Sequence, residues 1–355
     1  MFALKYRPKK LAEVKGQETT VETLKNSLKT NRLPHAIVLS GIRGIGKTTL
    51  ARIIGKALNC ENLQDGDACL ECASCKAFEQ DAHLDIIEID AASHTGVDNM
   101  RELIQSSQYK AVTGKSKVFI IDEAHMLSKS AFNALLKTLE EPPAHTYFIL
   151  ATTEIHKIPA TILSRCMHLN LSPFSALQIQ EHLERVLKQE GIPFEPDALN
   201  EIVMASSGSM RDALTLLNQI VIFNQNVSKE SVHNVVSLTS EDQILTVLDL
   251  LFQGNVEGAL EIVHKNTKDT TVFLQQIMDA MYSLICEKQN IRTGLIHKEL
   301  VEKIKEHLDL PTLFQIWHLL HDGYQELVES PLKSQTLDMI LMRIVYVDDF
   351  VKKKA

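Results

Sequence analysis

Eight consecutive residues, 41–48, have the spacing G-x-x-x-x-G-K-T of a phosphate-binding loop. In such a loop, backbone N–H groups point at an anion, and the start of the following helix adds partial positive charge. Lys47 would contact the β- and γ-phosphates, and the Thr48 hydroxyl would bind Mg²⁺. We therefore predict a nucleoside triphosphate site formed by Gly41, Ile42, Arg43, Gly44, Ile45, Gly46, Lys47 and Thr48.

The segments on either side of the loop have the patterns that such a site requires. Residues 36–40, AIVLS, form a short apolar run typical of a buried parallel strand. Residues 49–58 carry apolar side chains at helical spacing. A glycine turn that arose by chance would need neither the strand before it nor the helix after it. The presence of both therefore favours the phosphate site.

Two carboxylates, Asp122 and Glu123, follow directly after the apolar run VFII at 118–121. A buried central strand would place them at its carboxyl end, where open α/β sheets bind ligands. We assign Mg²⁺ binding to Asp122 and activation of the attacking water to Glu123. The alternative is two solvated acids at the start of a helix, where acidic side chains are favoured. The string DEAH at 122–125 also labels one helicase group, but the other helicase motifs are missing.

Four cysteines are spaced C-x₈-C-x₂-C-x₂-C, at Cys60, Cys69, Cys72 and Cys75. Four thiolates at this spacing can close a tetrahedral zinc site, which would be structural because no coordination position stays open. A disulfide framework is an alternative that suits small secreted chains, and an iron–sulfur cluster is another, without a redox partner in the sequence. Cys166 stands apart, and we expect it to be a small buried hydrophobe.

The 355 residues are enough for two or three domains. No apolar run reaches transmembrane length and the N-terminus lacks a secretory pattern, so we expect a cytoplasmic protein without a membrane partner. A net charge of −8 argues against a generally basic coat for nucleic acid, but not against DNA binding through a local surface.

Strands and helices alternate over about the first 170 residues. Apolar runs predict five strands, the last at a sheet edge: 36–40, 84–90, 118–121, 147–151 and 167–171. Besides the loop helix, helical spacing is found at 19–30, 97–109 and 130–140. This alternation predicts a parallel sheet covered on both faces.

From residue 176 onward the pattern is helical. Helices are expected at 176–190, 196–206 and 209–223, followed by a polar linker at 224–228. Later breaks are expected at Gly254, Asn266, Gly294, Pro311 and Pro331, and lysines 352–354 should form a solvated tail.

Taken together, these residues resemble the gamma/tau subunits of the bacterial DNA polymerase III clamp loader, a family of ATPases associated with diverse activities (AAA+). The resemblance covers nearly the whole chain. Besides the loop and the cysteines, it rests on KYRP (5–8), EIDAAS (88–93), IDEAHMLS (121–128), FNALLKTLEEPP (132–143), LATT (150–153), LSRC (163–166) and GSMRDAL (208–214).

The resemblance implies roles for residues that the spacing alone does not single out. Thr152 and Thr153 match the sensor-1 position, on the strand between the loop strand and the Asp122 strand. Arg211 matches the sensor-2 arginine of the helical lid. Arg165 matches the finger that completes a neighbouring subunit's site, where a guanidinium can accelerate phosphoryl transfer by ~10³–10⁵. Without the family context, Arg165 would be a surface ion-pair residue and Arg211 a helix-face charge.

By the same resemblance, the segment that packs around adenine contains Tyr6, Arg7, Val14, Gly16 and Gln17. The implied cofactors are ATP, Mg²⁺ and Zn²⁺. The implied fold is an α/β AAA+ domain at 1–171 with a five-stranded parallel sheet and a zinc module at 60–75, then two all-α domains. These are a helical lid at 172–226 and a helical oligomerisation domain, or collar, at 227–355.

The implied function is ATP-driven loading of the sliding clamp onto primer–template DNA at the replication fork, without polymerisation by this chain. The implied partners are the other subunits of a ring-shaped hetero-oligomer, the clamp, the DNA and, through companion subunits, single-stranded-DNA-binding protein. Tau forms carry a long C-terminal extension that contacts the polymerase and the replicative helicase, so a chain ending at Ala355 is expected to be gamma-like, or a species form without those tethers.

Two alternatives stay open. One is the non-hydrolysing sister subunit of the same loader, whose phosphate loop is degraded; the intact residues 46–48, GKT, argue against it. The other is a related AAA+ motor acting on stalled or branched DNA. Such motors lack the cysteine module, so the four cysteines argue against that alternative.

Overall fold

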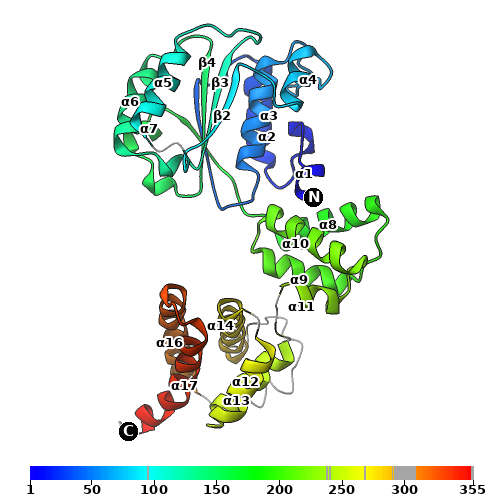
Figure 1. Cartoon of the computed structure of the whole chain (residues 1–355), viewed down its shortest axis with the longest axis vertical. Coiled ribbons are helices and arrows are strands. Elements are labelled where there is room, and N and C mark those ends of the chain that lie inside the picture. The colour runs from blue at the N-terminus through cyan, green and yellow to red at the C-terminus, as the bar shows by residue number, and fades with distance from the viewer. Residues whose placement is uncertain are drawn as a thin grey trace. The chain divides into compact units, whose positions relative to one another are not determined.

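The computed structural model describes residues 1–93, 96–236, 239, 241–267, 269–289, 291 and 309–352. The helix break expected at Gly294 and the last two lysines of the expected tail lie outside these residues. The chain folds as two compact units, Met1–Val227 and Ser228–Ala355 (Figure 1).

A five-stranded parallel sheet lies at the centre of the first unit, with the strand order β2-β3-β4-β1-β5. Its strands are β1 (Ala36–Ser40), β2 (Ile86–Asp90), β3 (Lys117–Asp122), β4 (Thr146–Thr152) and β5 (Met167–Asn170). The predicted sheet is confirmed, with β5 at an edge. Because β4 lies between β1 and β3, the carboxyl ends of these three strands meet at one edge of the sheet.

Helices cover both faces of the sheet (Figure 1). One face carries α2 (Glu18–Lys29), α3 (Lys47–Asn59) and α4 (Ala73–Glu79). The other carries α5 (Val97–Ser107), α6 (Lys129–Glu140) and α7 (Ala160–Leu163). Alternate residues of a strand point to opposite faces, so Ile37 packs with the first layer and Val38 with the second. Buried residues on both faces fix the register of the strands that end at the site.

Short elements connect these layers. They are α1 (Phe2–Lys5), η1 (Leu11–Glu13), η2 (Ala124–Met126) and η3 (Ile155–Lys157). The helix α1 packs on the helical part of the first unit, where Phe2 N donates to Asn218 Oδ1 at 3.3 Å.

Three helices complete the first unit: α8 (Ala176–Glu190), α9 (Pro196–Ser206) and α10 (Met210–Asn224). Their bounds lie within one residue of those predicted. Ser175 and Gln178 form a capping box that starts α8, and Gly191, with a φ of 68°, ends it. Buried leucines such as Leu183 and Leu199 hold the three helices together.

The second unit is helical throughout its described residues. Its helices are α11 (Lys229–Val236), α12 (Glu241–Phe252), α13 (Val256–Asn266), α14 (Thr270–Lys288), α16 (Leu310–Glu329) and α17 (Lys333–Lys352). The breaks predicted near Gly254, Asn266 and Pro331 are confirmed. Pro311 lies in the first turn of α16, where a missing N–H is tolerated. Among the described residues, none of the helices combines the length and apolar character needed to cross a bilayer.

Candidate nucleotide site and metal site

The predicted phosphate loop joins β1 to α3, and its backbone requires glycine. Gly41, Gly44 and Gly46 have φ values of 138°, 78° and 104°, which favour a residue without a side chain. A Cβ atom at Gly41 would also lie 2.4 Å from the side chain of Ile45. The loop is therefore preformed, with the first turn of α3 directly behind it.

Lys47 is buried and bonds to the loop itself. Its Nζ donates to the carbonyl oxygens of Gly41 at 2.9 Å and Ile42 at 2.8 Å. Burial lowers the pKa of Lys47, and the carboxylates of Glu123 and Asp122 oppose that shift. The ammonium can exchange these two neutral acceptors for phosphate oxygens, which bind a cation more strongly.

The two residues predicted to bind magnesium lie side by side. Thr48 Oγ1 donates to Asp122 Oδ2 at 2.7 Å, one from the start of α3 and the other from the end of β3. A hydroxyl and a carboxylate offer the hard oxygen ligands that Mg²⁺ prefers. The donor set therefore fits a magnesium ion.

Glu123 lies just beyond β3 in a left-handed conformation, with a φ of 46°. Such a backbone is uncommon for a residue with a side chain and is concentrated at functional sites. Its carboxylate accepts a hydrogen bond from Thr153 Oγ1 at 3.2 Å, so two of the predicted site residues are in contact.

His125 connects Glu123 to Thr152. Its Nδ1 lies 3.4 Å from Glu123 Oε2 and 3.1 Å from Thr152 Oγ1, while its Nε2 lies 3.3 Å from Glu154 Oε1. Sequence reasoning did not assign a role to His125 or Glu154. The signal was present in the DEAH and LATTE strings, but the pairing of β3 with β4 was needed to bring the two strings together.

The helix α10 contacts the loop through its first turn. Arg211 N donates to Gly44 O at 3.2 Å, and a Cβ atom at Gly44 would lie 1.9 Å from Ser209 Oγ. Arg211 is therefore near the phosphate loop, as a sensor-2 role requires.

The residues expected around adenine reach three different parts of the first unit. Tyr6 Oη donates to Glu190 Oε1 at 2.5 Å on α8, and Arg7 Nε donates to Thr49 Oγ1 at 3.0 Å beside the loop. Gln17 Nε2 donates to the carbonyl of Ser172 at 2.7 Å, where the sheet leads into the helices. Burial lowers the pKa of Arg7, and so does the nearby charge of Arg52. Val14 packs against the core beneath α2 and α3.

Arg165 is the predicted site residue that lies apart from this cluster. Its guanidinium donates to Thr161 O at 2.7 Å and forms an ion pair with Glu140 Oε1 at 2.5 Å. These partners lie on α7 and α6. The structure thus places Arg165 away from the loop of its own chain.

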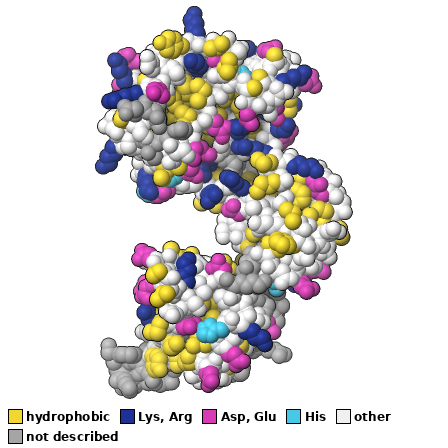
Figure 2. Space-filling view, in the orientation of Figure 1, with side chains coloured by type: hydrophobic (Ala, Val, Ile, Leu, Met, Phe, Trp, Pro, Cys, Tyr) yellow, Lys and Arg dark blue, Asp and Glu magenta, His cyan; other side chains and the backbone are white. Residues whose placement is uncertain are grey.

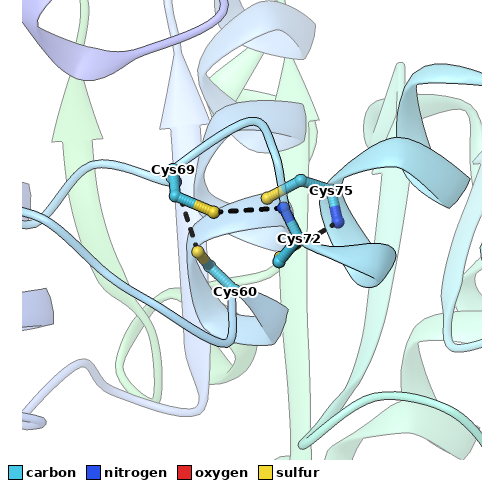
Figure 3. Close-up of side chains that lie close together, drawn as sticks. All are labelled: Cys60, Cys69, Cys72 and Cys75. Atoms are coloured by element: carbon cyan, nitrogen blue, oxygen red, sulfur yellow. Dashed lines mark hydrogen bonds between the residues drawn. The ribbon is translucent and has the colours of Figure 1, made fainter.

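The four predicted metal ligands come together after α3 and at the start of α4 (Figure 3). The Sγ atoms of Cys60, Cys69, Cys72 and Cys75 all lie within 4.8 Å of one another. Backbone N–H groups of the last three donate to the preceding sulfur, at 3.2, 3.4 and 3.5 Å. A zinc–sulfur distance of about 2.3 Å in a tetrahedron separates the sulfurs by about 3.8 Å, so the cluster fits a metal after a small contraction.

Within the cluster, thiol pKa values shift in both directions, and burial raises the pKa of Cys75. Hydrogen bonds from the backbone N–H groups of Glu71 and Cys72 lower the pKa of Cys69 to about 6, whereas burial raises that of Cys60. All six cysteines are free, so no disulfide framework is formed. Cys166 is half-buried, and burial raises the pKa of its thiol to about 11.

Three family models match the chain in succession. A model described as "DNA polymerase III, delta subunit" matches residues 16–175. A model of the DNA polymerase III clamp loader subunit ATPase lid domain matches residues 178–226, and one of subunits gamma and tau domain III matches residues 227–355. The first name belongs to another subunit of the polymerase, while the third names gamma and tau.

Relatives with similar sequences carry the gamma and tau names. DNA polymerase III subunit tau/gamma of Haemophilus influenzae is 40% identical over 97% of this chain and 50% of its own length. Subunit tau of Escherichia coli is 42% identical over 75% of this chain and 41% of its own length. The chain therefore spans half or less of these two proteins. Subunit gamma of Buchnera aphidicola (Baizongia pistaciae) is 35% identical over 97% of this chain and 96% of its own length.

Solved structures share the fold. The RuvB Holliday junction branch migration motor of Thermotoga maritima aligns with a TM-score of 0.50 at 20% identity, covering 71% of this chain and 80% of its own. At that identity the likeness shows the fold alone, which is that of the AAA+ ATPases. The sequence relatives decide the family: this chain belongs to the gamma/tau subunits of the DNA polymerase III clamp loader.

Proposed function

We propose that the chain binds and hydrolyses ATP as a motor subunit that loads the sliding clamp onto primed DNA. The observation that carries this proposal is the edge of the sheet where Lys47, Thr48 and Asp122 converge, with Thr48 Oγ1 and Asp122 Oδ2 2.7 Å apart. No step of DNA synthesis is assigned to this chain.

Each residue of the site has a role in the proposed reaction. The loop N–H groups and Lys47 would bind the phosphates, and Thr48 and Asp122 would hold Mg²⁺, which would neutralise charge on the phosphate oxygens. Glu123 accepts the proton of the attacking water, with Thr153 keeping its carboxylate oriented. Thr152 and Arg211 respond to the γ-phosphate from β4 and α10.

The domains follow the same proposal. Residues 1–171 form the ATPase domain, 172–226 the lid, and 227–355 the collar that joins this chain to other loader subunits. The four cysteines hold a structural zinc ion. Lys and Arg side chains are interspersed with Asp and Glu on the face shown in Figure 2, so we propose that DNA is contacted through a local surface. The chain would act at the replication fork in the cytoplasm, and companion subunits would contact single-stranded-DNA-binding protein.

The proposal is tested by purifying the chain with its companion subunits and its clamp and measuring ATP hydrolysis. Primed DNA together with the clamp should stimulate hydrolysis well above the rate with either alone. Stimulation by branched DNA without any effect of the clamp would instead favour a motor of the RuvB kind. ATP binding without hydrolysis, in the complete assembly, would favour a sister subunit.

Arg165 is proposed to act on the ATP of a neighbouring subunit. Arg165 follows α7, and its ion pair with Glu140 at the end of α6 holds it away from its own phosphate loop. The test mixes Arg165→Ala subunits, which keep a sound loop, with Lys47→Ala subunits, which keep a sound finger. Partial recovery of ATP hydrolysis in mixed oligomers is expected. A mixture that stays inactive although mixed oligomers form, or full activity of Arg165→Ala alone, contradicts this role.

A further inference from the structure

Residues 6–17, called the N-terminal strap below, contain little regular structure of their own. Arg7 contacts Thr49 beside the phosphate loop, whereas Tyr6 and Gln17 bond to Glu190 on α8 and to the carbonyl of Ser172. Between these ends the strap forms a single short 3-10 turn, η1. A segment with so few internal hydrogen bonds depends on outside partners for its order.

Asp67, within the cysteine module at 60–75, is one of those partners. Its carboxylate accepts hydrogen bonds from the backbone N–H groups of Leu11, at Oδ1, and Ala12, at Oδ2 and 3.2 Å. Lys25 Nζ lies 3.5 Å from Oδ2, and the Asp67 side chain is only 9% exposed. A buried carboxylate that accepts two N–H groups at the start of η1 holds that turn in place.

Glu79, at the end of α4, is the second partner. Its carboxylate pairs with Lys9 of the strap at 2.6 Å and with the buried Lys56 of the loop helix α3. Burial would raise the pKa of Glu79, but the hydrogen bonds from Lys56 and Lys9 lower it below its ordinary value. The middle of the strap is thus held at Lys9 and again at Leu11–Ala12.

The cysteine cluster fixes the positions of both carboxylates. Asp67 comes two residues before Cys69, and Glu79 four residues after Cys75. The turn at Gly66 lies against α2, where a Cβ atom would be 2.9 Å from the carbonyl oxygen of Lys25. If the four sulfurs separate, Asp67 and Glu79 are no longer held in position to bond to the strap.

From these contacts we infer that the cysteine module positions the N-terminal strap for nucleotide binding, with Asp67 as the main positioning residue. The inference rests on the proposed nucleotide site. Releasing the strap lowers the fraction of molecules that can bind nucleotide, and the apparent affinity falls in proportion. The turnover number should change little, because Glu123 and Asp122 have no contact with Asp67 or Glu79 among the described hydrogen bonds and ion pairs.

The test compares Asp67→Ala with Asp65→Ala in the full chain. Asp65 is in the same turn but pairs with Lys29 and has a side chain that is 72% exposed. We expect Asp67→Ala to keep its zinc, to weaken Mg·ADP binding about tenfold and to raise KM for ATP with kcat retained. Amide hydrogen exchange should accelerate at Leu11 and Ala12. Asp65→Ala should match the wild type, and Asp67→Asn should recover part of the affinity.

Unchanged ADP affinity and unchanged exchange at Leu11 and Ala12 in a zinc-loaded Asp67→Ala protein would overturn the inference. If Asp67→Ala loses zinc, the same measurements are made on wild-type protein from which a zinc-selective chelator has removed the zinc. Stripped protein should bind Mg·ADP about as weakly, with fast exchange at 9–17. Tight binding and slow exchange after stripping would also overturn the inference. A wild type that binds no nucleotide would instead refute the proposed function.

Discussion

The phosphate loop and the cysteine module are both short segments with a distinctive spacing, yet their polar groups are used in opposite ways. In the loop, Lys47 and Thr48 bond to groups of the site itself, the loop carbonyls and Asp122. In the module, Asp67 bonds to the strap, and Glu79, four residues beyond the module, bonds to the strap and to α3. In the loop, a bound nucleotide can replace the hydrogen-bond partners of Lys47 and Thr48. In the module, the partners of the carboxylates belong to the fold and stay the same.

Replacing Lys47 tests the loop side of this comparison most severely. We expect Lys47→Ala to keep the fold and to weaken ATP binding about a hundredfold or more, because the phosphates lose a charge-assisted partner. Calorimetry with Mg·ATP measures the loss. Lys188→Ala removes a lysine of α8 that pairs with Glu184 and should have no effect. Normal ATP hydrolysis by Lys47→Ala would show that the site is assigned wrongly.

Glu123→Gln separates ATP binding from ATP hydrolysis at the phosphate-loop site. The amide can still orient water but cannot accept its proton, so kcat should fall about 10²–10⁴-fold while the affinity for ATP stays within about twofold. Single-turnover hydrolysis and nucleotide binding are measured on the same preparation. Asp122→Asn is the comparison variant, and it should lose magnesium-dependent affinity. Loss of affinity in Glu123→Gln instead would mean that Glu123 belongs to the metal site.

Local features of the fold and site could be predicted from the sequence, and distant contacts could not. The loop, its strand and its helix could be predicted because all three lie in one continuous segment of the sequence. The resemblance added that the strand leading to Thr152 and Thr153 lies between the loop strand and the Asp122 strand, which the strand order bears out; β4 ends at Thr152, and Thr153 follows it. The roles of Asp67, in a polar turn, and Glu79, at the end of α4, could not be predicted, because each resembles any solvated acid in the sequence. Their partners, Leu11 and Lys9, lie more than fifty residues away in the sequence.

Removing the metal tests the module side. Cys60, Ala68 and Cys75 form a small cluster separate from the cores on the two faces of the sheet. We therefore expect Cys72→Ser to lose zinc and to unfold the module locally, while the thermal midpoint of the sheet falls by only about 5 °C. Zinc content, hydrogen exchange and thermal unfolding are the measurements. Cys166→Ser should keep its zinc. Global unfolding of Cys72→Ser would show that the module supports the sheet itself.

The smallest effect is expected at Gly44, where the loop contacts the start of α10. Arg211 N donates to Gly44 O at 3.2 Å, and an added Cβ would lie 1.9 Å from Ser209 Oγ. Gly44→Ala should therefore push the start of α10 away from the loop. The strain of an alanine at a φ of 78° adds about 1 kcal/mol. We expect KM for ATP to rise several-fold.

Two further variants separate backbone strain from the displacement of α10. Gly191→Ala imposes a similar strain, at a φ of 68°, with no atom within 4 Å of the new Cβ, and should leave KM unchanged. Gly44→Ala combined with Ser209→Ala removes the hydroxyl that the Cβ would meet and should lower KM part of the way back. If the double variant is no better than Gly44→Ala, the alanine acts on the phosphates directly. The contact between the loop and α10 would then have no part in nucleotide binding. The loop, unlike the module, would then act on the nucleotide without help from a structural contact.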